Sequence, residues 1–262
     1  MNNAPSFMGR VAALYRYPLQ GCGGQPLTHA NITAWDGFPF DRIIGLVEEI
    51  KRKTIDGEQV IHKLRGDIML LHLNSHYDPA TKELSLYNGP TCLVTARLPD
   101  EDDIIANQLA RLLGYEHHHT LTCGYKMGCD LLPATSKQQK PLIKGAYKKT
   151  AISIINRASV AALSTAMGVA IDETRFRANI YIDNLPPFAE WHWLGKTMPL
   201  GPLLIQPIER TTRCNIVEIN PKSGTRDLAL LNQLLYHYQH KDMGIYAEVI
   251  KGGSLTIGDT LG

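Results

Sequence analysis

The first half of the chain consists of short runs in which apolar and polar residues alternate. Successive side chains of a strand point to opposite faces of a sheet, so a period of two predicts half-buried strands. Gly, Pro, Asn and Asp residues separate the runs, and turns are expected at Asp36-Gly37 and Asp78-Pro79. This dense spacing favours a β-barrel or a sandwich over alternating α/β layers. The expected strands lie at 10–17, 68–73, 83–87 and 92–96, with two more within 26–49.

Apolar residues recur at helical spacing in only three stretches, 101–113, 157–167 and 226–238. An acidic cluster at 100–103 opens the first of them, where carboxylates interact favourably with the helix dipole. The second ends at Gly168, a residue type common just after a helix. Between the helices the pattern predicts strands at 151–155, 178–183, 203–208 and 245–250, and a hairpin around Gly252-Gly253.

A change in composition after residue 114 divides the chain. Residues 115–149 are rich in Gly, Lys, Gln and His without clear periodicity, and we expect them to form a long excursion between two domains. The sequence therefore predicts a mainly β (α+β) protein with a few short helices. Its expected domains are 8–114 and 115–262.

The overall composition is that of a soluble globular protein, with 44% hydrophobic and 20% charged residues among 262. The net charge is +2 and no Lys/Arg run is interleaved with aromatics, so we expect no nucleic-acid partner. Residues 1–115 carry 11 basic and 13 acidic residues, against 16 and 12 in the remainder. This asymmetry favours an anionic ligand near the second half.

Cysteine usage and hydropathy bear on location. Five cysteines without regular spacing argue against a disulfide framework and for a reducing compartment. The N-terminal stretch lacks the pattern of a secretory signal, and no run approaches 18 consecutive apolar residues. We expect a cytoplasmic protein with no membrane association.

Cys214 has the most distinctive chemical setting in the sequence. Arg210 and Arg213 precede it closely, and nearby positive charge favours the thiolate, which attacks electrophiles and binds soft metals. The alternative, a buried cysteine that acts as a small apolar residue, fits the local sequence equally well.

Three other groups of residues carry candidate chemistry. His117, His118 and His119, with Cys123 and Cys129, are zinc-ligand types, but their spacing matches no compact structural site, so we predict no structural zinc there. Cys123 and Cys129 also lack the CxxC spacing of a redox pair. Asp41-Arg42 follows a Gly-Phe-Pro-Phe turn and reads either as a surface ion pair or as an arginine that contacts a phosphate.

Several segments resemble a known family. Two early segments are similar to the N-terminal β-barrel domain that precedes the MOSC (molybdenum cofactor sulfurase C-terminal) domain. They are RVAALYRYPLQG and LTHANITAWDGFPFDRIIGLVEE. Four later segments resemble the MOSC β-barrel domain in its full order, and that domain is similar to the pyruvate-kinase barrel. The segments are ISIINRASVAAL, RFRANIYIDNLPPFAEWHWLGKTM, TTRCNIVEINPKSGTRD and GIYAEVIKGGSLTIGDTL. The resemblance covers about 8–98 and 145–261 and extends to mitochondrial amidoxime-reducing proteins and their bacterial relatives.

The resemblance implies a molybdenum cofactor (Mo-molybdopterin) held between the two domains, with the cysteine of the RC motif, Cys214, as the molybdenum ligand and catalytic residue. The sequence departs from the family pattern in two places. The lysine of its "YPVKG" element is Gln20 here, and basic Lys148 and Lys149 stand where an acidic residue often precedes the β run of the second domain. The implied cofactor-binding residues are Gln20, Arg42, Thr150, Arg177, Asn179 and Thr212.

The resemblance further implies an oxidoreductase that reduces N-hydroxylated compounds by oxo transfer. The chain has no Rossmann fingerprint, CxxCH haem motif or iron–sulfur cysteine cluster, so electrons are expected from a separate flavin, haem or ferredoxin partner. Three alternatives stay open beside this one. One is a sulfur-transfer protein that carries a persulfide on Cys214, and another is a non-catalytic carrier of the cofactor. The third is a decayed paralogue with an empty cleft, which the loss of the lysine at Gln20 leaves open.

Overall fold

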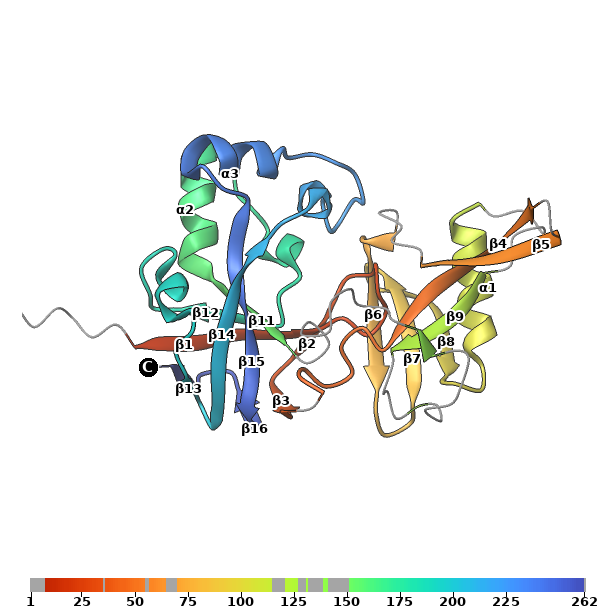
Figure 1. Ribbon diagram of the computed structural model, residues 1–262, viewed down its shortest axis with the longest axis horizontal. Coiled ribbons are helices and arrows are strands. Elements are labelled where there is room, and N and C mark those ends of the chain that lie inside the picture. The colour runs from red at the N-terminus through yellow and green to blue at the C-terminus, as the bar shows by residue number, and fades with distance from the viewer. Residues whose placement is uncertain are drawn as a thin grey trace, which may run out of the picture.

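The computed structural model describes residues 8–34, 36–54, 57–64, 70–114, 121–126, 131, 139–140 and 151–261, with the backbone alone for 49–54, 57–64 and 139–140. Two β-rich lobes lie side by side along the longest axis of the molecule (Figure 1). This confirms the expected mainly β class. No helix in the described part of the chain combines the length and apolar character that crossing a membrane demands.

A closed seven-stranded barrel forms the second lobe. Its strands run in the order β12, β11, β15, β14, β13, β17 and β1, and β1 pairs back with β12 to close the ring, while β2 extends from β1. Within this ring β11 and β12 are parallel. The bounds are β1 Gly9–Arg16, β2 Gln25–Leu27, β11 Ile152–Asn156, β12 Ile180–Asp183, β13 Met198–Leu200, β14 Leu203–Thr212, β15 Asp242–Lys251 and β17 Thr260–Leu261.

Apolar residues fill the barrel and also cover its outer wall. Inward positions such as Ile154, Ile205 and Ile245 are fully buried in one core cluster. A second cluster lies between the barrel and the helices α2 (Arg157–Met167) and α3 (Leu230–Tyr238), which pack on the same side of it (Figure 1). The side chain of Asn156 accepts the Ala158 N–H at 3.0 Å and caps α2. Short 3-10 turns complete this lobe: η3 (Glu173–Phe176), η4 (Ala189–Trp193) and η5 (Asn215–Glu218).

The first lobe holds two sheets around its own apolar core. Strands β10, β9, β4 and β5 form one sheet in that order, and β6, β7 and β8 form the other. In the described part of this lobe no strand pairing joins the two sheets, so the barrel expected here appears as two sheets that share a core with α1. The bounds are β4 Ile44–Thr54, β5 Gly57–Leu64, β6 Leu73–Asp78, β7 Glu83–Asn88, β8 Thr91–Arg97, α1 Asp102–Leu112, β9 Leu121–Lys126 and β10 Gln139–Lys140.

Strand pairing connects the two halves of the sequence more closely than composition predicts. β1 and β2 belong to the barrel of the second lobe, and β3 (His29–Ile32) pairs with β16 (Gly253–Thr256). β9, from the stretch 115–149 expected to be an excursion, pairs with β4 in the first lobe. The division at 114/115 stays a prediction. β1 and β2 precede this boundary but belong to the second lobe, and β9 follows it but belongs to the first lobe.

Three local expectations are wrong. Residues 70–72 form a turn, and the strand expected at 68–73 begins only at Leu73. The helix expected from 226 begins at Leu230, because Arg226 instead pairs with Glu218 and forms a β-bridge with Ile219. The hairpin expected around Gly252-Gly253 does not form, since β16 pairs with β3 rather than with β15.

Candidate functional site

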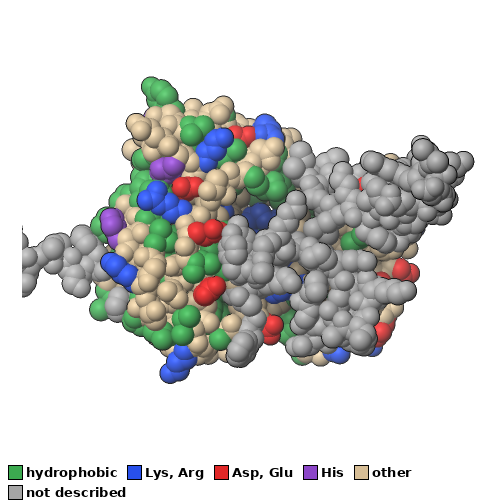
Figure 2. All heavy atoms as spheres, viewed as in Figure 1, with side chains coloured by type: hydrophobic (Ala, Val, Ile, Leu, Met, Phe, Trp, Pro, Cys, Tyr) green, Lys and Arg blue, Asp and Glu red, His purple; other side chains and the backbone are tan. Residues whose placement is uncertain are grey.

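A cavity of about 250 Å³ lies where the two lobes meet, and we call it the arginine cavity. Four arginines line it, and no carboxylate side chain is found among the described lining residues. On the face shown in Figure 2, acidic and basic side chains are instead interspersed over the second lobe. The lining comprises Gln20, Gly21, Arg42, Leu71, Arg175, Phe176, Arg177, Thr211, Thr212, Arg213, Cys214, Ile216, Val217 and Tyr246.

Arg42 is held in place by the buried Asp41 and by Tyr17. The Tyr17 N–H donates to Asp41 Oδ1 at 2.8 Å, and Arg42 Nη1 donates to the other oxygen of the same carboxylate. The Arg42 N–H donates to the Tyr17 carbonyl at 2.8 Å. Of the two sequence interpretations, the ion pair is therefore present, but it lies in a cavity wall, with only 24% of the arginine side chain exposed.

Arg177 enters the cavity from the end of η3 and reaches the other lobe. Its Nη1 donates to the Cys22 carbonyl, and its own carbonyl accepts a 3.4 Å hydrogen bond from Arg42 Nη2. The guanidinium carbons of Arg42 and Arg177 lie 5.3 Å and 4.8 Å from the centroid of the Tyr17 ring. The structure thus brings together two arginines that are 135 positions apart, although their contact with a phosphate stays a prediction.

The two like charges are costly to keep together. Burial, and then the positive charge of Arg42, lower the pKa of Arg177. A bound anion would offset both effects, because it supplies the negative charge and the hydrogen-bond acceptors that bulk water otherwise provides. The electrostatics of the cavity therefore suit an oxyanion.

Cys214 is exposed at the wall of this cavity, directly before η5. The alternative of a buried structural cysteine is wrong for this residue. The expectation that Arg210 and Arg213 both flank the thiol is also wrong. Arg213, directly after β14, donates to the Phe176 carbonyl at 2.8 Å, whereas Arg210, within β14, stacks on Trp191 at 4.1 Å.

Several polar atoms of the arginine cavity are buried without a hydrogen-bond partner. They are Gln20 Oε1, Thr211 Oγ1, and both Nε and Nη1 of Arg175. Leaving a buried polar group unsatisfied costs about 1–3 kcal/mol, and more when the group is charged, so folded proteins rarely retain several in one place. Acceptor and donor oxygens of a polar ligand would satisfy these atoms, and a soft thiol stands beside them. The lining residues therefore fit a phosphate-bearing cofactor that also carries a soft metal.

The remaining implied ligands divide into three cases. Thr212 lines the cavity and donates to Asp242 Oδ1 at 2.6 Å. Asn179 does not line it, because its side chain accepts from Ser153 Oγ at 2.8 Å and donates to the Tyr15 carbonyl at 3.3 Å. We correct the expectation for Asn179 accordingly, since it links strands of the barrel. Thr150, with Lys148 and Lys149, lies outside the described residues.

Sequence reasoning missed Arg175 and Thr211 as cavity residues. Thr211 lies next to the implied ligand Thr212 and three residues before Cys214, and this closeness in sequence is the signal that could have found it. No comparable signal existed for Arg175, which reaches the cavity from a 3-10 turn. Its position depends on how η3 packs against η5, a contact between segments about 40 residues apart in sequence.

Most of the candidate zinc ligands lie outside the described residues, namely His117, His118, His119 and Cys129. Cys123 lies buried in β9, where its thiol donates to the Asp102 carbonyl at 3.3 Å and burial raises its pKa. Across the described ranges, no three His, Cys, Asp or Glu side chains gather as a metal site would require. The prediction about zinc stays untested for the histidines.

Comparison with known proteins identifies the same family as the sequence motifs. The MOSC domain profile matches residues 130–262. The chain is 26% identical to a molybdenum cofactor sulfurase of Caenorhabditis elegans over 93% of its own length and 34% of that relative. It is 24% identical to mitochondrial amidoxime reducing component 2 of Bos taurus, over 96% of this chain and 82% of the relative.

The molybdenum cofactor sulfurase of Drosophila mojavensis is 33% identical, over 83% of this chain and 29% of that relative. The chain thus spans about a third of the length of the sulfurases that it matches. Among solved structures, the YUAD protein from Bacillus subtilis is similar over 97% of this chain and 94% of that one, at 11% identity and a TM-score of 0.42.

Proposed function

This chain belongs to the MOSC domain family, and we propose that its arginine cavity binds the molybdenum cofactor and that the protein is an oxidoreductase of N-hydroxylated compounds. The observation that carries this proposal is the convergence of an exposed cysteine and two arginines from distant parts of the sequence on one cavity. The amidoxime reducing components, which are similar over most of their length, support the reductase assignment.

The cavity residues have distinct roles in this proposal. Arg42 and Arg177 hold the terminal phosphate through charge-assisted hydrogen bonds, each contributing about 1.5–3 kcal/mol. Gln20 and Thr212 contact polar atoms of the pterin, and Thr211 joins them because its buried hydroxyl has no protein partner. Cys214 supplies a soft thiolate as the metal ligand. When bound, the cofactor supplies the two-electron oxo-transfer chemistry that protein side chains lack.

Gln20 in place of the family's lysine removes one positive charge from the cavity. The structure offers a further cation in the lining, Arg213, which follows the end of β14. Arg213 is committed to the carbonyls of Phe176 and Met243, so its guanidinium acts on an anion through its charge rather than through free donors. The charge of Arg213 is our explanation of how the cavity holds a dianion without the lysine.

Electrons reach the cavity from a separate flavin, haem or ferredoxin protein in this proposal, because the sequence has no motif for binding a nicotinamide, haem or iron–sulfur group. Turnover by the purified protein with NADH or NADPH alone would contradict this. A cytoplasmic location stays the expectation from the cysteine content.

Sulfur transfer is the second candidate function. Its support is that Cys214 is both exposed and inside the cavity, and that the sulfurases match nearly the whole chain. In that case Cys214 would carry sulfur as a persulfide. The third candidate, a carrier that binds the cofactor without turnover, would use the same arginines and leave the thiol without a chemical role.

Molybdenum and pterin analysis of the protein from a cofactor-competent host tests the proposal. We expect about one molybdenum and one pterin per chain, together with reduction of an amidoxime when a reduced electron donor is supplied. A persulfide on Cys214 without molybdenum would favour sulfur transfer, and bound cofactor without turnover would favour the carrier. Protein that binds no cofactor and carries no persulfide on Cys214 would overturn all three.

A further inference from the structure

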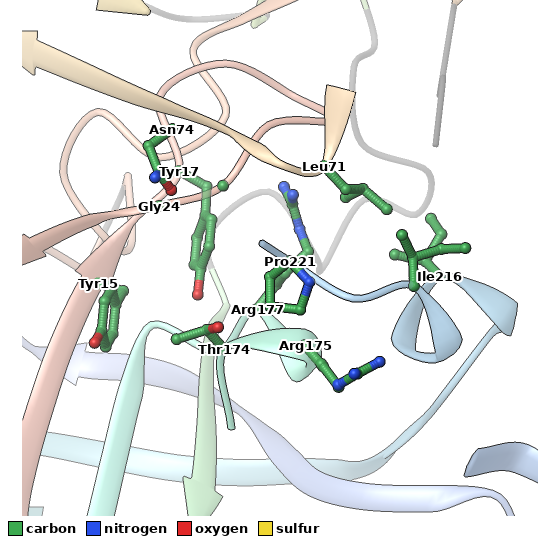
Figure 3. Close-up of a pocket in the computed structure, with 12 residues that line it drawn as sticks. Tyr15, Tyr17, Gly24, Leu71, Asn74, Thr174, Arg175, Arg177, Ile216 and Pro221 are labelled. Carbon is green, nitrogen blue, oxygen red and sulfur yellow. The ribbon is translucent and has the colours of Figure 1, made fainter. Parts of the chain in front are cut away.

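A second, smaller cavity of about 90 Å³ adjoins the arginine cavity (Figure 3). Leu71, Arg175, Arg177 and Ile216 line both, so they form the shared wall. Figure 3 shows Arg175 and Arg177 extending in different directions from the same segment of chain. The rest of the lining is Tyr15, Tyr17, Gly23, Gly24, Asn74, Thr174, Ile219 and Pro221.

Arg175 is the unusual residue of this wall. Its Nη2 donates to Asp227 Oδ2 at 2.7 Å, which fixes one end of the guanidinium. The side chain is only 4% exposed, yet Nε and Nη1 have no hydrogen-bond partner. Buried N–H groups of a charged side chain are costly to leave unsatisfied, so their presence beside a cavity points to a ligand with acceptor oxygens.

The size of the small cavity limits what enters it. At about 90 Å³ it is smaller than the cavity of roughly 150 Å³ that holds benzene in a protein core, so a fused pterin ring does not fit. The backbone of Gly24 lies directly against the Tyr17 ring, where a Cβ would come within 2.6 Å of Cε1 and cannot be accommodated. The space suits a single oxyanion group.

We propose that the small cavity is an oxyanion subsite for the substrate, with Arg175 as its principal donor. The proposal rests on the proposed function in taking the arginine cavity as the cofactor site. Arg42 lines only the larger cavity, where it and Arg177 meet one phosphate, so the donors of Arg175 serve a second oxyanion. The substrate is then an N-hydroxylated compound that carries a carboxylate or a comparable anionic group.

Titration calorimetry with inorganic sulfate tests the subsite on cofactor-loaded and cofactor-free protein. We expect one sulfate to bind the loaded protein, and Arg175→Gln to weaken that binding about tenfold or more. Asp227→Asn should strengthen it, because the variant keeps Arg175 and removes the competing negative charge. Arg157→Gln is the matched control, since Arg157 forms a similar ion pair with Glu173 outside both cavities, and it should leave sulfate affinity unchanged.

Steady-state kinetics complete the test with two amidoximes that differ only by a carboxylate. Arg175→Gln should raise KM about tenfold for the acidic compound and leave kcat/KM for the neutral one within twofold. If Arg175 merely supports the fold through Asp227, then Arg175→Gln and Asp227→Asn would weaken sulfate binding alike, and the proposal is wrong.

Two further outcomes separate this proposal from the proposed function. Sulfate binding by the cofactor-free protein alone would mean that sulfate binds only where the cofactor otherwise lies, which overturns the substrate subsite and leaves cofactor binding intact. Wild-type protein that contains no molybdenum would overturn the proposed function, whereas sulfate binding and its loss in Arg175→Gln would still establish the subsite.

Discussion

Both arginines that face each other in the cavity have left-handed backbone conformations, with φ of 51° at Arg42 and 51° at Arg177. This conformation costs a non-glycine residue roughly 1–2 kcal/mol. The Arg42 N–H donates to the Tyr17 carbonyl at 2.8 Å and the Arg177 N–H donates to the Thr174 carbonyl at 3.1 Å, and these hydrogen bonds stabilise the conformation. Strain kept at two positions of one cavity is typical of a functional site, because it directs side chains where regular structure would not.

At the residue scale, Cys214→Ser should abolish molybdenum loading and leave the melting temperature within about 2 °C of wild type. A hydroxyl with a far higher pKa does not replace a thiolate as a soft ligand, and an exposed side chain contributes little to stability. Elemental analysis and a thermal melt check both parts.

Cys92→Ser is the matched control for this prediction, because Cys92 is also exposed but lies in β8 of the first lobe. Cys22 is a poor control, since it is fully buried in the first-lobe core and burial raises its pKa to about 12. Full molybdenum content in Cys214→Ser would contradict the assigned ligand.

At the scale of elements, β14 and β15 connect the barrel to the cavity. β14 ends at Thr212, beside Arg213 and Cys214, and β15 supplies the Met243 carbonyl that accepts from Arg213 Nε at 2.8 Å. Gly244, with φ of 80°, lies in β15 against the Ile154 carbonyl, where a Cβ would overlap the oxygen. Close packing of β15 on β11 therefore requires glycine at this position.

Gly244→Ala should destabilise the protein by about 2 kcal/mol or more, since it combines a strained φ with a backbone clash. Gly168→Ala, at the end of α2, is the control: its φ of 65° is similar but nothing lies within 4 Å of the added Cβ. It should cost only about 1 kcal/mol. Urea unfolding measures both, and equal losses would show that the contact with Ile154 carries no energy.

The turn η4 is joined to α2 through a buried carboxyl group. Glu190 is fully buried and accepts from Ser159 Oγ at 3.1 Å. Burial raises the pKa of Glu190, so the folded state binds its proton more tightly than the unfolded state does. Wild-type stability attributable to this group is therefore present at low pH and lost as the pH rises through the raised pKa.

Glu190→Gln stays neutral at every pH, and its stability relative to wild type should increase as the pH rises from 4 towards 8. The expected gain is about 1.4 kcal/mol for each unit by which the pKa is raised. Urea unfolding of both proteins across this pH range checks it. A constant difference between Glu190→Gln and wild type would mean that Glu190 does not titrate in this range.

At the scale of the whole molecule, the arginine cavity draws its donors from both lobes. A ligand that binds only the folded state stabilises it by RT ln(1 + [L]/Kd), about 2.7 kcal/mol at a hundredfold excess over Kd. Because Arg42 and Arg177 reach the cavity from different lobes, such a ligand stabilises their arrangement as well as each lobe.

We therefore expect cofactor-loaded protein to melt several degrees above cofactor-free protein, and Arg42→Ala or Arg177→Ala to reduce that difference by lowering cofactor content. Differential scanning calorimetry with pterin fluorescence measures both quantities. Arg97→Ala, an exposed arginine of β8, serves as the control and should keep the full difference. Identical melting of the two forms would show that the ligand does not bridge the lobes.

Local pattern in the sequence determined much of this protein. Alternation and turn residues predicted β7, β8 and most barrel strands, and helical spacing predicted α2 with its observed bounds, because each signal depends on neighbours within one element. The RC motif likewise pointed to Cys214, and the turn before Arg42 to that arginine.

Only the tertiary structure decided which partners these elements have. It placed β1 in the barrel of the second lobe, paired β16 with β3 and directed Arg210 onto Trp191 instead of the thiol. It also left Asn179 hydrogen-bonded within the barrel and left two donors of Arg175 buried without a hydrogen-bond partner. The physical reason is that pairing and burial depend on contacts between segments far apart in the chain, which no local period records.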